Sequence, residues 1–105
     1  MACRVIADFT FKEGWCDKIR AMLEDGKNGL NLTANFKGCI DIDMSIDMDN
    51  PNRMILTETW EEREHHSKYM EFRQTEGPEG VVAQILDNLS QEPAFSWSEV
   101  VYKGQ

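Results

Sequence analysis

The sequence has few of the groups on which several common protein classes depend. The 105 residues include only three cysteines, two histidines and three prolines, and no long hydrophobic run. A membrane-spanning helix needs about 18 to 20 apolar residues in succession, so none is expected. The N-terminus lacks the basic segment and apolar stretch of a secretory signal, so we expect a cytoplasmic protein. An odd number of widely spaced cysteines fits reduced thiols there better than a disulfide framework.

Positive charge is also scarce. Eleven lysines and arginines stand against nineteen acidic residues, which gives a formal net charge of -8, and the basic residues form no cluster. Because a nucleic-acid backbone is anionic, this balance argues against a nucleic-acid partner. The length and the 41% hydrophobic content predict a single globular domain over residues 1–105.

Motifs for metals and cofactors are missing as well. The sequence has no glycine-rich phosphate loop and no cluster of histidines and cysteines with metal-ligand spacing. The acidic run from Asp41 to Asp49 superficially suggests a calcium loop, but it lacks the turn glycine and the distal glutamate. Its alternating spacing is that of one face of a strand. We therefore expect neither a metal nor a dedicated cofactor.

The apolar residues that are present recur with clear periods. Period-two alternation predicts strands over residues 3–11, 40–48, 53–60 and 95–102. Helical periodicity predicts one helix from Trp15 toward Leu30, fraying near Gly26 to Gly29, and two more over 61–73 and 81–89. This order, with an extra short helix, is the split βαβ arrangement of the ferredoxin-like α+β fold, with an antiparallel sheet and its helices on one face.

The two faces of the predicted sheet suggest how the domain assembles. The alternation from Ile40 to Met48 predicts a strand with one buried and one polar face. Helices can cover only one face of such a sheet, and we expect several large apolar side chains on the other. Pairing two sheets face to face about a two-fold axis would cover them, so a homodimer is predicted.

Five short segments, taken in order, resemble the antibiotic biosynthesis monooxygenase family. They are Lys12-Glu13-Gly14, Gly38-Cys39, Asn50-Pro51-Asn52-Arg53, Glu58-Thr59-Trp60 and the helical segment from Trp60 to Arg73. The resemblance implies a dimeric α+β barrel. In the characterised enzymes of the family it also implies oxygenation of polyphenolic or quinol substrates without a metal or flavin, whereas related branches degrade haem or have no assigned reaction. Many members carry a histidine on the second helix where this chain has Tyr69.

Glu58 is the first candidate catalytic residue. It is the one charged side chain on a strand face with three large apolar residues, Met54, Leu56 and Trp60. A carboxylate in apolar surroundings has a raised pKa, which suits a general base or a hydrogen-bond anchor. The alternative is a structural carboxylate paired with an arginine or a backbone amide.

His65 and His66 are the other candidate bases. Neighbours on a helix point about 100° apart, so only one of them can face a pocket. The sequence does not choose between them, because each has an apolar partner four residues on or close to it. A histidine that titrates near neutrality could deprotonate a phenol. The alternative is a solvated or core histidine.

Large aromatic side chains could form the walls of a substrate pocket or simply the core. These candidates are Trp60, Tyr69, Phe72 and Trp97. Arg73, at the end of the second long helix, could meet a phenolate, a carboxylate or Glu76.

The sequence thus favours a cofactor-independent monooxygenase acting on a small phenolic, quinol or polyketide-like aromatic compound. A non-catalytic dimer that binds a small hydrophobic molecule or supports a pathway is the alternative from another class. Haem degradation is a third hypothesis. It calls for an iron-ligating histidine on the second helix and a polar amide near the first strand, where this chain has Asp8.

Overall fold

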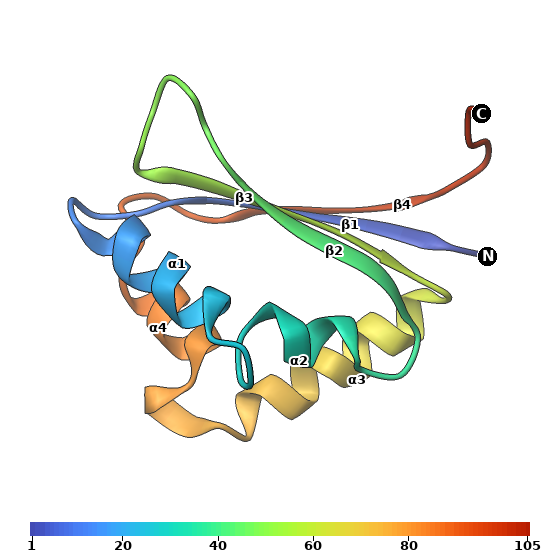
Figure 1. Ribbon diagram of the computed structural model, residues 1–105, viewed down its shortest axis with the longest axis horizontal. Coiled ribbons are helices and arrows are strands. Elements are labelled where there is room, and N and C mark those ends of the chain that lie inside the picture. Colours follow the sequence, from blue (N-terminus) through green and yellow to red (C-terminus); the bar gives the residue numbers. More distant parts are fainter.

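The structure is a computed structural model that describes residues 1–105. It contains β1 (Cys3–Thr10), α1 (Trp15–Glu24), α2 (Leu30–Ala34), β2 (Cys39–Ile46), β3 (Arg53–Trp60), α3 (Arg63–Gln74), the short 3-10 helix η1 (Gly77–Glu79), α4 (Val81–Asp87) and β4 (Ala94–Glu99). The helices all lie on one side of the sheet, and the opposite side is open (Figure 1). None of the helices combines the length and the hydrophobicity needed to cross a membrane.

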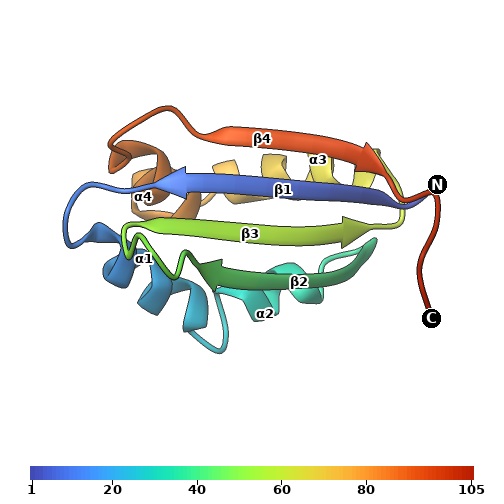
Figure 2. The same cartoon turned by 90° about the horizontal axis from the view of Figure 1, so that it is seen from above.

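The strands form one antiparallel sheet in the order β2-β3-β1-β4 (Figure 2). β3 therefore lies between β1 and β2, and β1 lies between β3 and β4. This topology is the ferredoxin-like α+β fold that the sequence predicts.

The register of β1 against β3 decides which side chains face the helices. Val5 lies opposite Glu58, and Ala7 lies opposite Leu56. These positions alternate with residues of the open face, so the main core forms between this face and the helices, with Phe9, Phe11, Ile19, Met54 and Ile85 among its buried residues. Glu58 thus lies on the apolar side of the sheet.

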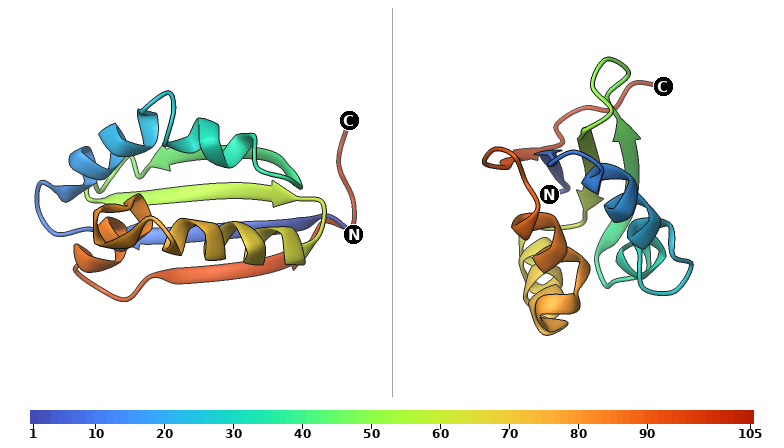
Figure 3. Two further views of the ribbon diagram at one scale, coloured as in Figure 1. Left: turned by 90° about the horizontal axis from the view of Figure 1, so that it is seen from below. Right: turned by 90° about the vertical axis from the view of Figure 1, so that its left-hand side faces the viewer.

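The helices form two pairs beneath the sheet (Figure 3). α1 and α2 make one pair, on the side of β2, and α3 and α4 make the other, under β1 and β4. The prediction of one helix from Trp15 toward Leu30 is wrong, because α1 ends at Glu24 and α2 begins at Leu30. The Asp25 carboxylate accepts hydrogen bonds from the backbone N–H groups of Lys27 and Asn28, each with an N···O distance of 3.4 Å. These bonds stabilise a turn in place of a continuous helix.

The open face of the sheet is mostly polar. The expectation of several large apolar side chains there is wrong, since Ile6 and Ile55 are the two such residues on it. The Arg53 guanidinium instead forms ion pairs with Asp8 and Asp47, both at 2.7 Å. Polar residues alternate with most core residues along the strands, and the few isoleucines among them do not make this face apolar.

Two strands differ in extent from their predictions. β2 is an edge strand with an irregular register at Ile40, whose side chain is exposed, and it ends before the fully exposed Met48. The predicted buried face of this strand is therefore limited to the partly buried Ile42, Met44 and Ile46. β4 ends at Glu99, which leaves Val101 and Tyr102 exposed beyond the sheet.

Candidate functional site

A small apolar cavity lies between the sheet and the two helix pairs. Its volume is about 180 Å³, and thirteen of its fifteen lining residues are hydrophobic. Phe9, Leu56 and Phe95 contribute from the strands, and the helices contribute residues such as Leu23 and Ile85. The two remaining residues, Glu58 and His66, bring one carboxylate and one imidazole into apolar surroundings.

Glu58 is 5% exposed and has no cationic partner. Its Oε1 accepts a hydrogen bond from Trp60 Nε1 at 2.9 Å, because both side chains lie on the same face of β3. Burial raises the pKa of the Glu58 carboxyl, although the Trp60 hydrogen bond and the more distant Arg73 oppose this shift. The second oxygen, Oε2, makes no hydrogen bond. It is not fully buried, because the one fully buried side-chain polar atom without a hydrogen-bond partner is His65 Nδ1. It can therefore be reached from the cavity.

The structure selects His66 over His65 for this cavity. His66 is 4% exposed, and its Nε2 lies 3.9 Å from Glu58 Oε1. That separation is too long for a direct hydrogen bond. Trp97 Nε1 donates to His66 Nδ1 at 3.2 Å. Burial, with a smaller contribution from the positive charge of Arg63, lowers the pKa of His66, which favours a neutral imidazole beside Glu58 over an ion pair.

His65 points to a different part of the molecule. Its ring packs on Gly38, which has a positive φ of 92° at the turn into β2, and a Cβ at this glycine would overlap the ring. Its Nδ1 is buried without a hydrogen-bond partner. The structure therefore does not bring His65 together with Glu58.

Tyr69 lines the cavity with its ring, but its hydroxyl is engaged elsewhere. The Tyr69 oxygen lies 2.6 Å from Thr33 Oγ1 and accepts a hydrogen bond from Arg73 Nε at 2.8 Å. Burial raises the pKa of this hydroxyl, and the same two hydrogen bonds oppose the shift. Tyr69 therefore contributes an aromatic wall and not a free polar group.

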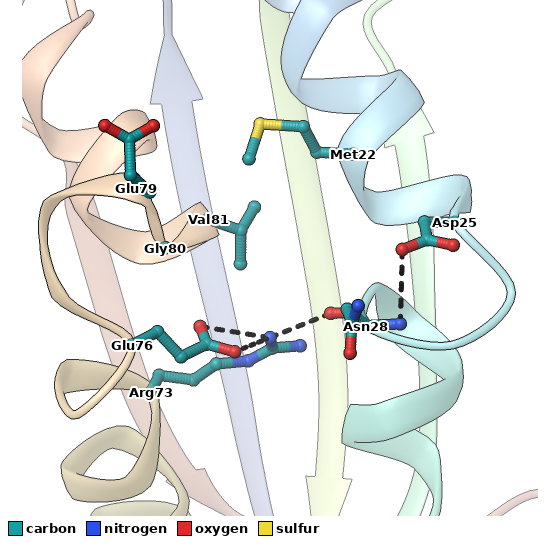
Figure 4. Close-up of a pocket in the computed structure, with 8 residues that line it drawn as sticks. All are labelled: Met22, Asp25, Asn28, Arg73, Glu76, Glu79, Gly80 and Val81. Carbon is teal, nitrogen blue, oxygen red and sulfur yellow. Dashed lines mark hydrogen bonds and ion pairs between the residues drawn. The ribbon is translucent and has the colours of Figure 1, made fainter.

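Arg73 lies outside the cavity and is only 1% exposed. Its guanidinium donates to the carbonyl of Asn28 at 2.9 Å and to the Glu76 carboxylate at 3.0 Å (Figure 4). It also donates to the carbonyl of Gly29 at 2.9 Å. Each of its nitrogens is bonded to protein, so no donor remains for a substrate in the apolar cavity. Of the partners suggested by the sequence, Glu76 is the one that the structure shows.

The other predicted aromatic residues surround the cavity without lining it. Trp60 is fully buried in a second core cluster with Cys3, Val5 and Tyr69, and it reaches the site through its hydrogen bond to Glu58. Phe72 is exposed on the outer side of α3 and packs beside Phe36. Trp97 is 40% exposed and covers His66 from the outside.

Sequence reasoning did not identify the cavity walls from α4 and β4. These walls are formed by Val82, Leu86 and Phe95. The sequence did contain a sign of these walls. Positions 81, 82, 85 and 86 are all apolar, and on a helix they form a stripe wider than is needed to pack against the core alone.

Comparison with known proteins agrees with the fold. The family model described as antibiotic biosynthesis monooxygenase matches residues 2–76. The chain therefore belongs to the antibiotic biosynthesis monooxygenase family. No curated protein is significantly similar in sequence.

Solved structures show the same architecture. A crystal structure of an antibiotic biosynthesis monooxygenase aligns with a TM-score of 0.75 and 17% identity over 95% of this chain and 99% of its own. The protein Rv0793 from Mycobacterium tuberculosis aligns with a TM-score of 0.75 and 19% sequence identity over 100% of both chains. A conserved protein from Methanosarcina mazei Go1 aligns with a TM-score of 0.76 and 17% sequence identity over 93% of this chain and 91% of its own. At these identities the likeness concerns the fold alone.

Proposed function

We propose that this chain is a cofactor-independent monooxygenase of a small phenolic, quinol or polyketide-like aromatic compound, with Glu58 as the general base. The observation that carries the proposal is a carboxylate without a cationic partner in the wall of an apolar cavity. Family membership supports the reaction class. The raised pKa of Glu58 supports its role, because a base works best when its pKa approaches the working pH.

The proposed chemistry needs no outside reductant. Glu58 removes the hydroxyl proton of the substrate, and the resulting phenolate is electron-rich enough to react with dioxygen. A phenol and one dioxygen molecule give a quinone and one water, so the substrate supplies all the electrons. The apolar walls exclude bulk water from the anion while it reacts.

In this proposal the protein acts as a homodimer in the cytoplasm. The open face of the sheet and the family support the dimer. The partner of the site is a small hydrophobic or aromatic molecule, and the negative net charge disfavours nucleic acid.

Non-catalytic binding of a small hydrophobic molecule is the second candidate function. The nearly uniform apolar lining favours it. Haem degradation is less well supported, because the one imidazole in the cavity already accepts a hydrogen bond from Trp97 and lies beside a carboxyl group.

Oxygen consumption with a panel of phenols and hydroquinones tests the proposal. We expect turnover without added metal, flavin or nicotinamide, and no change on chelation. Glu58→Gln keeps the size of the side chain but not its basicity, so turnover should fall by about 10²-fold or more. Glu64→Gln, an exposed change on α3, is the matched control and should leave the rate unchanged. Equal rates for wild type and Glu58→Gln would exclude Glu58 as the base.

A further inference from the structure

We infer that Trp97 is a positioning residue that holds His66 in the tautomer with hydrogen on Nε2, so that Glu58 and His66 present one acceptor and one donor to a single hydroxyl group. This inference rests on the proposed function and deepens it. It assigns His66 the role of hydrogen-bond donor and names the substrate group that the site recognises.

The tautomer follows from the hydrogen bond to Trp97. An indole N–H can only donate, and it lies 3.2 Å from His66 Nδ1. Nδ1 must therefore offer its lone pair, and in the neutral imidazole the ring hydrogen is on Nε2. Nδ1 is then occupied, and Nε2 already carries its hydrogen. Neither nitrogen is free to act as a base, which leaves the carboxylate of Glu58 for that role.

The spacing of the two polar groups fits one bridging oxygen atom. His66 Nε2 and Glu58 Oε1 are 3.9 Å apart, and an oxygen at about 2.8 Å from each can accept from the first and donate to the second. Oε1 has a second lone pair to offer beside its bond from Trp60, and Oε2 has no partner. A hydroxyl group both donates and accepts, so it fits this pair. An ether oxygen lacks the hydrogen, and a carboxylate would be repelled by Glu58.

The same arrangement defines the proton transfer. The substrate O–H bond breaks, its proton passes to the Glu58 carboxylate, and the electron pair stays on the substrate oxygen. The new oxyanion keeps the hydrogen bond from His66 Nε2, while the imidazole remains neutral. Nothing is oxidised or reduced in this step.

Trp97 is well placed for a positioning role. It follows the cavity residue Phe95 by two positions on β4, and the Arg63 guanidinium lies 5.1 Å from its ring centroid. These contacts hold the indole over the outer side of His66. Trp97→Phe would keep an aromatic ring there and remove the N–H donor together with the five-membered ring of the indole.

Nitrogen-15 NMR of the ring nitrogens tests the tautomer directly. At about pH 8 the imidazole is neutral, and we expect a pyridine-type shift for Nδ1 and a pyrrole-type shift for Nε2 of His66. The resonances are assigned by their loss in His66→Gln. Trp97→Phe should give a mixture of tautomers, whereas Trp15→Phe on α1 should give the wild-type spectrum. A wild-type His66 with its hydrogen on Nδ1 would overturn the inference without the need for any variant.

Binding measurements test the hydroxyl specificity. p-Cresol and its methyl ether, 4-methylanisole, differ only in the donor hydrogen and one methyl group. Titrations without oxygen should show p-cresol binding at least about tenfold more tightly to wild type, since one charge-assisted hydrogen bond is lost in the ether. Trp97→Phe should reduce this preference, and Trp15→Phe should not. Equal affinities for the two probes in wild type would refute the two-point site. If the preference holds while no phenol consumes oxygen, the proposed monooxygenase function fails and this inference stands.

Discussion

At the scale of single residues, the burial of Glu58 lowers the stability of the fold when its carboxyl group is ionised. Its folded-state pKa is raised by burial, so the native state holds the proton more tightly than the unfolded chain does. The contribution of Glu58 to stability is therefore greatest below its unfolded pKa and is lost as pH rises through the folded pKa. Above that pH the fold must bury a charge whose main support is the Trp60 hydrogen bond.

We accordingly expect Glu58→Gln to melt at a higher temperature than wild type at about pH 8, because the amide still accepts from Trp60 and carries no charge to bury. The difference should shrink as pH is lowered past the folded pKa of Glu58. Thermal melts monitored by circular dichroism across this range measure it, with Glu64→Gln as control. A variant that melts several degrees below wild type at about pH 8 would show that the carboxylate stabilises the fold.

The raised pKa of Glu58 could be predicted from the sequence, but its hydrogen bond from Trp60 could not. Strand alternation fixes the face of a residue, and the apolar neighbours at 54, 56 and 60 define its environment. The choice between His65 and His66 depends instead on tertiary contacts. The ring of His65 packs on Gly38, and His66 accepts a hydrogen bond from Trp97. No local pattern encodes either contact.

At the scale of secondary-structure elements, α3 shows why helix orientation was harder to predict than helix position. The predicted range 61–73 nearly matches Arg63–Gln74. The face that the helix buries, however, carries His66, Tyr69 and Arg73, and two of these would usually be assigned to solvent. The polar residues interrupt the apolar stripe that sequence periodicity depends on. Their burial is possible because each has partners on another element.

Arg73 joins α3 to the loop that precedes α2. We expect Arg73→Lys to lower stability by about 3 kcal/mol, because a lysine cannot replace all the buried hydrogen bonds of the guanidinium. In a domain of this size that corresponds to a fall in melting temperature of more than about 10 °C. Hydrogen exchange should also show faster opening of α2.

Arg20→Lys is the matched control, since Arg20 forms an exposed pair with Glu24 within α1 and should have little effect. If Arg73→Lys melted within a degree or two of wild type, the buried network would not be what holds the two helix pairs together.

At the scale of the whole molecule, the sequence was enough for the topology but not for the open face. The order of strands and helices restricts a chain of this length to few arrangements, and the ferredoxin-like one is observed. The chemistry of the open face depends on which polar side chains pair across strands. Asp8 and Arg53 are distant in sequence but adjacent in the sheet. Such pairing lets a face with few large apolar residues pack against another surface, because its charges already have partners.

The homodimer is therefore predicted to form through this polar face, with Ile6 and Ile55 near its centre and the Arg53 ion pairs at one end. Light scattering at micromolar concentration should give about twice the chain mass of 12.1 kDa. Ile6→Glu would place an unpaired charge on both facing surfaces and should shift the protein toward monomer. Ala21→Glu adds the same charge at an exposed position on α1, on the helical side of the sheet (Figure 1), and should leave the dimer intact. A wild-type monomer would rule out the dimer, and an Ile6→Glu variant that stays dimeric would place the interface on another surface.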